Sequence, residues 1–580
     1  METKQASIRS GKIVCNVSCT KYEIVRHVAK KVFGWKLSYE EESEEWDLFW
    51  TDSAVQPEKL AKMRHYQRIN HFPGMYLISR KNYLAFNLGK LRKLFPNDYN
   101  FFPKTWVIPC DLSDLKSYMS TKKNPYVIVK PEASCQGRGI YLTKKIEDIN
   151  PDEKHVVQEY LSKPFLIDGL KFDLRIYVLV TSCDPLRIFI HEDGLTRFAT
   201  EEYEKPNLNN IEDLCMHLTN YAINKNNPNF IYNEDPECDD VGHKRSLKST
   251  FEHLSDLKKN VEKLKSRIDD MIIKTLCTIQ PNLCHHYRSC QSEDYSRSMC
   301  FEILGFDVIL DKSLNPYILE VNHTPSFTTD SPLDRVIKKR VISEAIKLIN
   351  ISLPNRKKYF KKQKEDIQKR SLTGKLERLT KEEKEALINL IGKKKNKYES
   401  KHAGGFRKIY PVEGSEKYSG FIEAADNIWR EWTGAKIIRS KRVENKKVRI
   451  LEKRIGGKNG IVRRQVEELS MERPNSTIFE RLSQPIIRKY RSTTTGYLPG
   501  VVYDEKKDEK KEEKREYPVI IYGESEKLQP KPRTLTELKH PSPSKPSTQR
   551  HIIETLKQLL TTRQNTVAKN KYLEYLLNNR

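Results

Sequence analysis

The stretch FEILGFDVILDKSLNPYILEVNHTPSF, residues 301–327, reads as two apolar strands joined by a short polar turn. A four-residue turn at KSLN would pair Leu310 with Tyr317 and would place Asp307 opposite Glu320. Like charges directly opposite each other in a sheet repel, and a buried carboxylate is costly unless it is paired or bound to a metal. The hairpin therefore predicts that Asp307 and Glu320 share a compensating partner.

Asn322 adds a third oxygen to this pair. It lies two residues beyond Glu320, and side chains two apart on a strand point to the same face. Two carboxylates and an amide oxygen suit a Mg²⁺ ion that is shared with substrate phosphates. The alternative is that one carboxyl is protonated or paired with an arginine.

The whole chain is long and basic. Its 580 residues allow two or more domains, and 105 Lys and Arg against 78 Asp and Glu give a net charge of +27. This charge favours a polyanionic partner, which is nucleic acid, anionic lipid or an acidic protein surface. The chain has no run of 18 apolar residues and no apolar signal-peptide core at its N-terminus. We therefore expect a cytoplasmic protein with no membrane partner, whose eleven cysteines are reduced thiols.

Strand-like and helix-like segments mix along the first part of the chain without regular alternation, which predicts an α+β fold. Residues 12–55 read as strand, helix and strand. Strand signals dominate from 105 to 180, and residues 259–279 have a helical pattern.

The composition changes near residue 350. Residues 351–410 hold 19 Lys and Arg against 7 Asp and Glu, and Thr380 followed by Glu383 forms a capping-box pattern that predicts a helix. After about residue 435 the chain is mostly charged, and its low-complexity segments predict disorder.

A glycine-containing segment follows the strand YVIVKP. Lys130 ends that strand, and Gln136-Gly-Arg-Gly139 precedes the next one. Glycines let a backbone approach phosphates closely, while N–H groups and basic side chains supply positive charge. The segment does not have the Walker A spacing, and a plain hairpin turn is the alternative.

Two further segments offer polar groups beside apolar strands. In VVQEYL, Gln158 and Glu159 could form hydrogen bonds with the edge of a base. In KFDLRIYVLV, alternation places Lys171, Asp173 and Arg175 on one face, with apolar residues on the other. A solvated sheet face is the alternative for this second set.

In this order, the segments resemble the tubulin tyrosine ligase-like family, whose members are ATP-grasp ligases that add amino acids to tubulin tails. The resemblance covers roughly residues 12–350 and weakens toward 412. Among the members, the chain looks most like the polyglutamylases, particularly those that elongate glutamate chains. The segments that carry the resemblance are INHFPGM (69–75), YVIVKP, CQGRGI, QEYL, DGLKFDLRIYVLV, TSCDPLRIF, DGLTRFAT, CMHLTNYAIN, FEILGFDVILD and PYILEVNHTPSF.

The resemblance implies ATP and Mg²⁺ as cofactors and a role for each matching residue. The implied ATP-binding residues are Lys130, Gln136, Gly137, Arg138, Gly139, Gln158, Glu159, Tyr160, Leu161, Lys171, Phe172, Asp173, Thr219 and Asn220. The implied metal ligands are Asp307, Glu320 and Asn322, and the implied catalytic residues are Arg175, Glu320 and Lys130. The incoming glutamate would contact Arg197, Tyr221 and Lys244, and the acceptor would contact Gln136, Arg138 and His323.

The resemblance also implies a domain organisation. An ATP-grasp core would precede a basic extension that binds microtubules, for which a merely solvated charged helix is the alternative. The expected parts are an N-terminal α/β subdomain (1–100), a central ATP-grasp subdomain (101–185), a C-terminal ATP-grasp subdomain (186–350), the extension (351–412) and a mostly disordered charged tail with short helices (413–580).

The implied reaction is ATP-dependent ligation of L-glutamate to tubulin tails through an acylphosphate, with chain elongation favoured. One alternative is a ligase of the same family that uses glycine or tyrosine. Another is a catalytically weak protein that binds microtubules or nucleic acid, although the tyrosines of the basic segment form no recognisable RNA-binding module. The expected partners are tubulin and microtubules, the expected state is a monomer, and the expected location is the cytoskeleton, including the axoneme and basal body of cilia.

Overall fold

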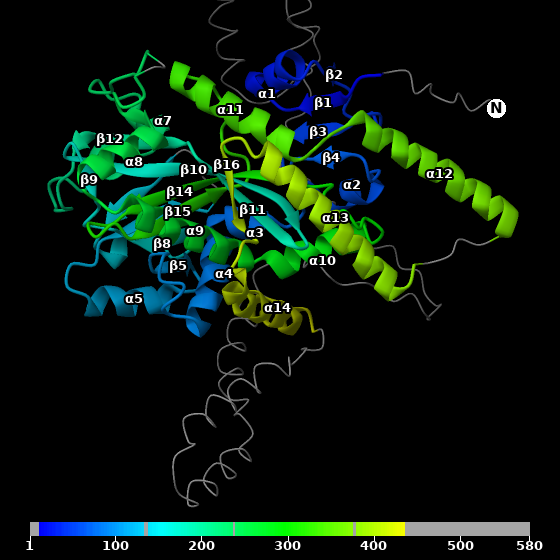
Figure 1. Cartoon of the computed structure of the whole chain (residues 1–580). Helices are drawn as coiled ribbons and strands as arrows, with labels where there is room; N and C mark the ends of the chain where they lie inside the picture. The colour runs from blue at the N-terminus through cyan, green and yellow to red at the C-terminus, as the bar shows by residue number, and fades with distance from the viewer. Residues whose placement is uncertain (1–10, 133–136, 236–237, 375–378, 435–580) are drawn as a thin grey trace, which may run out of the picture. The chain divides into compact units, whose positions relative to one another are not determined.

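The computed structural model describes residues 11–132, 137–235, 238–374 and 379–434 (Figure 1). This part of the chain holds three β-sheets surrounded by helices, so the α+β class is confirmed. None of the described helices combines the length and the apolar composition that crossing a membrane requires.

The N-terminal segment forms a small parallel sheet in the order β2-β1-β3-β4. The predicted strand, helix and strand of residues 12–55 are present. A parallel bridge between Ile69 and Cys300 connects this sheet to the start of the predicted hairpin. The elements are β1 (Val14–Cys19), α1 (Glu23–His27), the π-helix η1 (Val28–Val32), β2 (Lys36–Ser38), β3 (Leu48–Thr51), α2 (Pro57–Lys62), β4 (Arg68–Ile69), α3 (Tyr76–Ser79) and α4 (Lys81–Leu94).

The second sheet is antiparallel, in the order β5-β8-β6-β7. Its strands alternate between two small cores. Val127 and Val129 pack against Leu115 of α5 on one face, while Ile128 and Leu218 share a cluster on the other. The elements are β5 (Thr105–Ile108), α5 (Leu112–Thr121), β6 (Val127–Pro131), β7 (Tyr141–Thr143), the 3-10 helix η2 (Ile146–Asp148) and β8 (His155–Glu159).

The central sheet is built around the 14-residue strand β10. Its order is β13-β12-β10-β11-β16, with β14 on the other side of β10 and β15 beyond β14. Its elements are β9 (Leu166–Ile167), β10 (Leu170–Cys183), β11 (Leu186–His191), β12 (Leu195–Glu202), β13 (Lys244–Ser246), β14 (Glu302–Leu310), β15 (Pro316–Asn322) and β16 (Phe406–Tyr410).

Apolar side chains cover both faces of β10. Leu174 and Ile176 join the core that contains the apolar residues of α9 and α10, whereas Tyr177 and Leu179 join the core that contains those of α11. The central sheet is therefore a buried layer between two groups of helices (Figure 1). The helices are α6 (Leu214–His217), α7 (Tyr221–Asn224), α8 (Leu247–Asp256), α9 (Val261–Cys277), α10 (Gln280–Cys290) and α11 (Pro332–Leu348).

The basic extension begins as two helices, α12 (Leu353–Thr373) and α13 (Lys381–His402). The predicted capping box is confirmed, because the Thr380 hydroxyl accepts from the Glu383 N–H and the Glu383 carboxylate accepts from the Thr380 N–H. The extension then returns to the core as β16, which pairs with the edge of β11.

Residues 413–434, the first part of the expected tail, form the 3-10 helix η3 (Ser415–Tyr418) and the helix α14 (Ser419–Thr433). Phe421 of α14 is buried against Phe95 and Tyr99. The predicted disorder beyond residue 435 lies outside the described residues.

Candidate active site

The hairpin of β14 and β15 holds the carboxylate pair. Asp307 pairs with Glu320 as predicted, but Leu310 pairs with Pro316 and not with Tyr317. The register prediction at the turn was therefore wrong by one residue, because the connecting loop has five residues and not four. Asp307 and Glu320 still lie opposite each other, because a second one-residue register shift between the loop and the two carboxylates compensates for the first.

That second shift is a β-bulge at Leu319, which no strand partner opposes. Ile318 and Val321 on either side both enter the core. Leu319 and Glu320 consequently both face a cavity. The bulge thus presents an apolar and an acidic side chain side by side, which strict alternation would forbid.

Asp307 is held by two guanidinium groups. Arg175 contacts it with two nitrogens, including Nη2 to Oδ2 at 2.9 Å, and Arg197 Nη2 lies 2.8 Å from Oδ2. Burial raises the pKa of the Asp307 carboxyl, but the charges of Arg175 and Arg197 outweigh burial and hold the pKa well below its usual range. Asp307 is therefore a carboxylate, and the arginine-paired alternative applies to it.

Glu320 has the opposite electrostatics. Burial, followed by the Asp307 charge, raises the pKa of its carboxyl. Asn322 Nδ2 donates to Glu320 Oε1 at 3.1 Å, so the three side chains form one cluster as predicted. In the absence of a cation, the Asp307–Glu320 pair is stable only when one member keeps a proton.

The donor set fits Mg²⁺. A carboxylate, a second carboxyl that can ionise and an amide side chain whose oxygen can turn inward are hard oxygen ligands of the kind that Mg²⁺ takes. A divalent cation would also remove the repulsion that raises the pKa of Glu320. Asp307 would share its oxygens between the cation and the two arginines.

Two lysines line the same cavity as these carboxylates, of which Lys171 is buried and Lys130 is partly buried. Lys130 Nζ donates to Gln158 Oε1 at 2.9 Å, and Lys171 Nζ donates to the Tyr160 hydroxyl at 2.9 Å. Within the described part of the chain, neither ammonium forms an ion pair. Burial lowers the pKa of Lys130 to about 8 and that of Lys171 to about 7. The face of β10 that carries Lys171 is thus buried rather than solvated.

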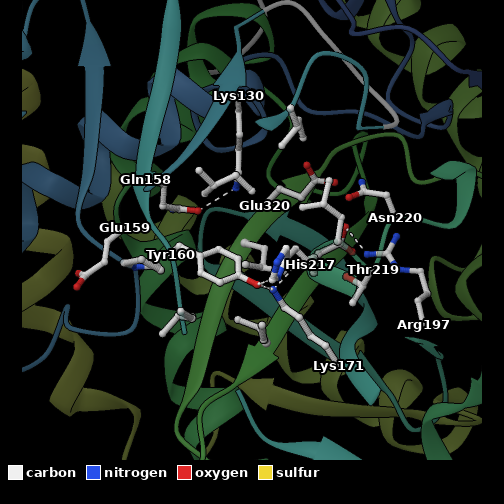
Figure 2. Close-up of a pocket in the computed structure, with 18 residues that line it drawn as sticks. Lys130, Gln158, Glu159, Tyr160, Lys171, Arg197, His217, Thr219, Asn220 and Glu320 are labelled. Atoms are coloured by element: carbon white, nitrogen blue, oxygen red, sulfur yellow. Dashed lines mark hydrogen bonds and ion pairs between the residues drawn. The ribbon is translucent and has the colours of Figure 1, made fainter. Parts of the chain in front are cut away.

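One cavity opens between these groups, and side chains from both sides line it. Figure 2 shows Gln158, Glu159 and Tyr160 toward one side of the view and Thr219 and Asn220 toward the other. The predicted residues that line it are Lys130, Gln158, Glu159, Tyr160, Leu161, Lys171, Arg197, Thr219, Asn220, Asp307 and Glu320.

Sequence reasoning missed the apolar lining and His217. Ile128, Leu218 and Ile309 form walls suited to the flat face of a base. The carbonyl of His217 accepts from Lys171 Nζ at 2.7 Å. His217 stands in the quoted segment CMHLTNYAIN, but a backbone carbonyl leaves no signal in the residue type.

Several predicted ATP-binding residues do not line the cavity. Phe172 is buried in the core against Phe165 and Phe198. Asp173 is fully buried, and its Oδ1 accepts from Arg197 Nε at 3.1 Å. Arg175, which was predicted to be catalytic, contacts Asp307 and does not line the cavity.

The glycine-containing loop lies partly outside the described residues, including Gln136. Gly137 and Gly139 both have positive φ, of 80° and 67°. A Cβ on Gly137 would stand 2.5 Å from Ile223 Cδ1, so a side chain here would displace Ile223 and would also adopt a strained backbone conformation. Arg138 between them is exposed. Gly137 therefore packs against α7, next to the Asn220 end of the cavity.

Of the three residues expected to hold the amino acid, two meet directly. Lys244 Nζ lies 3.6 Å from the centre of the Tyr221 ring and 2.7 Å from Asp334 Oδ2. Arg197 pairs with Lys244 across β12 and β13, but its guanidinium turns to Asp173 and Asp307. Arg197 thus links the carboxylate cluster to the neighbourhood of Lys244.

His323 follows the carboxylate hairpin and lines a second, smaller cavity. Its ring centre is 5.6 Å from that of His71. Burial, assisted by His71 and Arg80, lowers the pKa of His323 to about 4, so the imidazole is neutral at physiological pH. His71 is itself fixed by the buried Glu302 carboxylate, 2.7 Å from its Nδ1.

Comparison with known proteins explains this arrangement. A model of the tubulin-tyrosine ligase family matches residues 59–359, which is more than half of the chain. The chain belongs to the tubulin-tyrosine ligase family. The resemblance inferred from the ordered motifs is thereby confirmed, together with an ATP-grasp-like core of mixed helices and sheets. The matched range contains each predicted site residue of this family member.

Individual relatives narrow the comparison. This family member is 53% identical over 432 residues to a probable beta-tubulin polyglutamylase of Tetrahymena thermophila, covering 74% of this chain and 36% of the relative. It is 46% identical to tubulin polyglutamylase ttll6 of Danio rerio (73% of this chain, 54% of the relative). It is 44% identical to tubulin polyglutamylase TTLL6 of Homo sapiens (72% and 46%). The chain thus spans about a third to a half of the length of these relatives.

Proposed function

We propose that this chain is an ATP-dependent ligase that adds glutamate to glutamate side chains in acidic tubulin tails. The observation that carries the proposal is the meeting, within one cavity, of Lys130 and Lys171, which form no ion pair among the described residues, with Glu320, whose pKa is raised by burial and by the neighbouring Asp307 charge. A nucleotide polyphosphate would pair with the two lysines, and Mg²⁺ would offset the repulsion between Asp307 and Glu320. The names of the relatives support tubulin as acceptor and glutamate as donor.

In the first step, a carboxylate oxygen of the acceptor attacks the γ-phosphorus of ATP, the bond to the β-phosphate oxygen breaks, and ADP leaves. Lys130 and Lys171 hold phosphate oxygens, while the hinge at Gln158–Leu161 holds the base. Asp307, Glu320 and Asn322 would bind Mg²⁺, which offsets charge on the transferring phosphoryl group. Arg175 fixes Asp307 in its ionised form.

In the second step, the neutral α-amine of free glutamate attacks the carbonyl carbon of the acylphosphate. A C–N bond forms, the C–O bond to phosphate breaks, and the nitrogen loses one proton. The site must therefore hold the anionic acceptor tail and the anionic free glutamate beside ATP. Arg197 and Lys244 provide positive charge on the side of the cavity where the amino acid would enter.

The preference for chain elongation is assigned to His323. A neutral imidazole at the end of β15 can accept or donate one hydrogen bond without repelling a cationic amine. We propose that it contacts the acceptor glutamate, together with Arg138 and Gln136. The ratio of elongated chains to new branch points in a His323→Ala variant tests this role.

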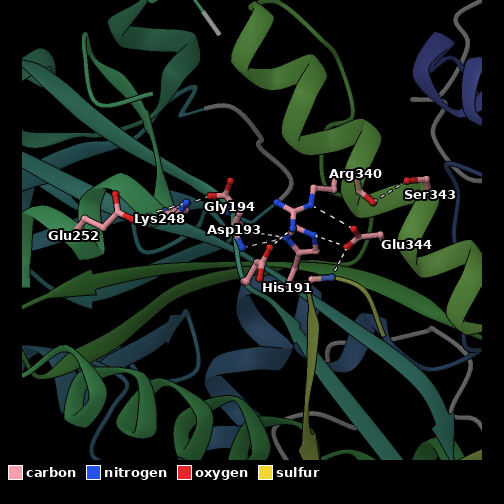
Figure 3. Close-up of polar contacts among 10 residues, drawn as sticks. His191, Asp193, Gly194, Lys248, Glu252, Arg340, Ser343 and Glu344 are labelled. Carbon is pink, nitrogen blue, oxygen red and sulfur yellow. Dashed lines mark hydrogen bonds and ion pairs between the residues drawn. The ribbon is translucent and has the colours of Figure 1, made fainter. Parts of the chain in front are cut away.

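The extension of α12 and α13 is proposed to bind the acidic microtubule surface. α12 buries none of its residues, and lysine is its most frequent residue type. Its continuation is fastened to the core at the turn before β16, where Glu344 Oε2 accepts from the Gly405 N–H at 2.8 Å and lies 3.2 Å from His191 Nε2. Figure 3 shows the Glu344 carboxylate beside Arg340 and His191, with a dashed line to each. These contacts hold the C-terminal end of the extension against the core, so a microtubule bound to the extension would have a fixed position relative to the active site.

We further propose that the monomer acts on the cytoskeleton, including the axoneme and basal body, and that its domains follow the division given above. The decisive experiment supplies microtubules, ATP and one labelled amino acid at a time, and reads the tail peptides by mass spectrometry. Incorporation of glutamate alone supports the proposal. Incorporation of glycine or tyrosine alone, or of none, contradicts it.

A further inference from the structure

Helix α13 is attached to the core by polar contacts rather than by an apolar face. Of its 22 residues, Glu399 alone is buried, and its leucines and isoleucines are all at least partly exposed. Helices in proteins are usually held by an apolar stripe that packs against a core. The attachment of α13 therefore depends on the charges and hydrogen bonds of its C-terminal half.

The interface around Glu399 has a surplus of positive charge. Glu399 Oε2 accepts from Arg187 Nη1 of β11 at 2.6 Å and lies 3.1 Å from Lys408 Nζ of β16, so one carboxylate faces two cations. Asn396 Oδ1 accepts from the same two side chains, at 2.7 Å and 3.1 Å. Glu399 Oε1 finds no hydrogen-bond partner among the described residues. The polar network that holds α13 is therefore both cationic and incomplete.

Lys395, one helical turn before Glu399, is left out of this network. A lysine and a glutamate four residues apart can pair on a helix, but Glu399 turns to β11 and β16 instead. Lys395 Nζ donates to Ser298 Oγ at 3.0 Å and to the carbonyl of Thr181 at 3.3 Å, and it forms no ion pair within the described part of the chain. Thr181 belongs to β10 and is 3% exposed, so the ammonium reaches the central sheet.

Charged groups from the neighbouring elements act on this ammonium. Burial, together with Arg187 of β11 and Arg68 of β4, lowers the pKa of Lys395 to about 7, although Glu399 and Asp294 oppose the change. A neutral amine fills such a position at a lower cost than an ammonium, because an unpaired charge is expensive to remove from water.

We propose that α13 attaches to the core with loss of the Lys395 proton, so that this contact is a pH-sensitive fastening of the basic extension. In a detached helix, Lys395 is an ordinary charged lysine. The attached state binds fewer protons, so attachment becomes tighter as pH rises from about 7 and is weakest at pH 7 and below. Burial also lowers the pKa of Lys408, which adds to the change in the same direction. The contact lies outside the proposed active site, and its test needs no ligase activity.

Hydrogen exchange of the α13 amides measures the attachment, because a detached helix without an apolar face is only marginally stable in water. Protection factors remove the intrinsic pH dependence of amide exchange. In the full chain, those of α13 should rise about tenfold for each pH unit between pH 7.5 and pH 9, which corresponds to one proton lost on attachment. Those of the core helix α9 should change far less. Protection of α13 that is independent of pH would overturn the inference.

Variants of α13 assign the effect to Lys395. Lys395→Met carries no charge, so it should increase the protection of α13 at pH 7 and lose most of the dependence on pH. Lys395→Arg keeps its charge at every pH, because a guanidinium does not lose its proton in proteins, and it should leave α13 weakly protected from pH 7 to pH 9. Lys394→Met removes an exposed ammonium from the adjacent position and should behave as the unaltered protein.

The arginine variant separates this role from a merely structural one. A side chain that was needed only as a hydrogen-bond donor would be replaced well by arginine, and α13 would keep the protection of the unaltered protein. That result, or an unaltered pH dependence in Lys395→Met, would overturn the inference.

Discussion

Glu320 holds a proton more readily than an ordinary glutamate, because burial and the Asp307 charge both raise its pKa. Glutamine has the shape of the protonated side chain. We therefore expect Glu320→Gln to leave the melting temperature nearly unchanged and to lower the ligation rate roughly 100-fold or more, since a charged metal ligand contributes several kcal/mol. Calorimetry and incorporation of labelled glutamate measure the two effects.

The exposed Glu147→Gln is the matched control, because it makes the same chemical change outside the cavity. Its activity should equal that of the unaltered protein. Full activity in Glu320→Gln would refute the metal assignment, and a large loss of stability would show that Glu320 is ionised and needed for folding.

The two cavity lysines predict that ATP affinity depends on pH. In the free protein the pKa of Lys171 is about 7 and that of Lys130 is about 8. Bound phosphates favour the charged ammonium and raise both values, so binding takes up protons. Affinity should be highest at low pH and should fall as pH rises from 7 to 9.

Fluorescence titration with an ATP analogue at several pH values measures this slope, and calorimetry in buffers of different ionisation enthalpy measures the proton uptake. Lys171→Met should weaken ATP binding and should make the affinity less dependent on pH near pH 7. Equal affinity at pH 7 and pH 9 would show that both lysines are already charged in the free protein.

At the level of residues, charge and periodicity predicted the Asp307–Glu320 pair and the Asn322 contact. They did not predict the bulge at Leu319, because a single extra residue in a strand has no compositional signature. The burial of Phe172 was readable from its place on the apolar face of β10, although the resemblance had assigned it to ATP.

At the level of elements, α13 is joined to the central sheet by a buried ion pair. Arg187 Nη1 on β11 donates to Glu399 Oε2 at 2.6 Å, and Lys408 Nζ on β16 lies 3.1 Å from the same oxygen. Glu399 is 2% exposed. Loss of one member of such a pair leaves an uncompensated charge, so Glu399→Gln should destabilise the protein by about 3 kcal/mol.

Chemical denaturation measures this change, and Glu385→Gln on the exposed part of α13 is the control. An unaltered midpoint in Glu399→Gln would mean that the extension is attached only loosely. Composition predicted the helices and the net charge of the extension. It did not predict that FRKIY returns as a sheet strand, since only the partner strand β11 reveals that pairing.

At the level of the whole molecule, the charge of the extension predicts salt-sensitive docking. Replacing the exposed Lys362, Lys364 and Lys369 of α12 by glutamine should weaken co-sedimentation with microtubules roughly tenfold at low salt, at about 0.5 kcal/mol for each charge. The difference should shrink as salt increases, because screening shortens the reach of surface charges. Activity on a soluble tail peptide should remain.

The control for this experiment replaces Lys258, Lys259 and Lys263, which are exposed lysines on and before α9. Equal co-sedimentation of both triple variants would reject the docking role of α12. Removal of everything after residue 350 is a less informative test, because it also uncovers β11 and leaves Arg187 without its carboxylate.

The pairing of β11 with β16 has a consequence for synthesis of the chain on the ribosome. About 200 residues separate His191 at the end of β11 from Phe406 at the start of β16. Translation at about 5–20 residues per second leaves the edge of β11 uncovered for roughly 10–40 s. An open strand edge is a template for aggregation, so the nascent chain needs protection during that interval, and chaperone supply should limit the yield of the protein more than its final stability does.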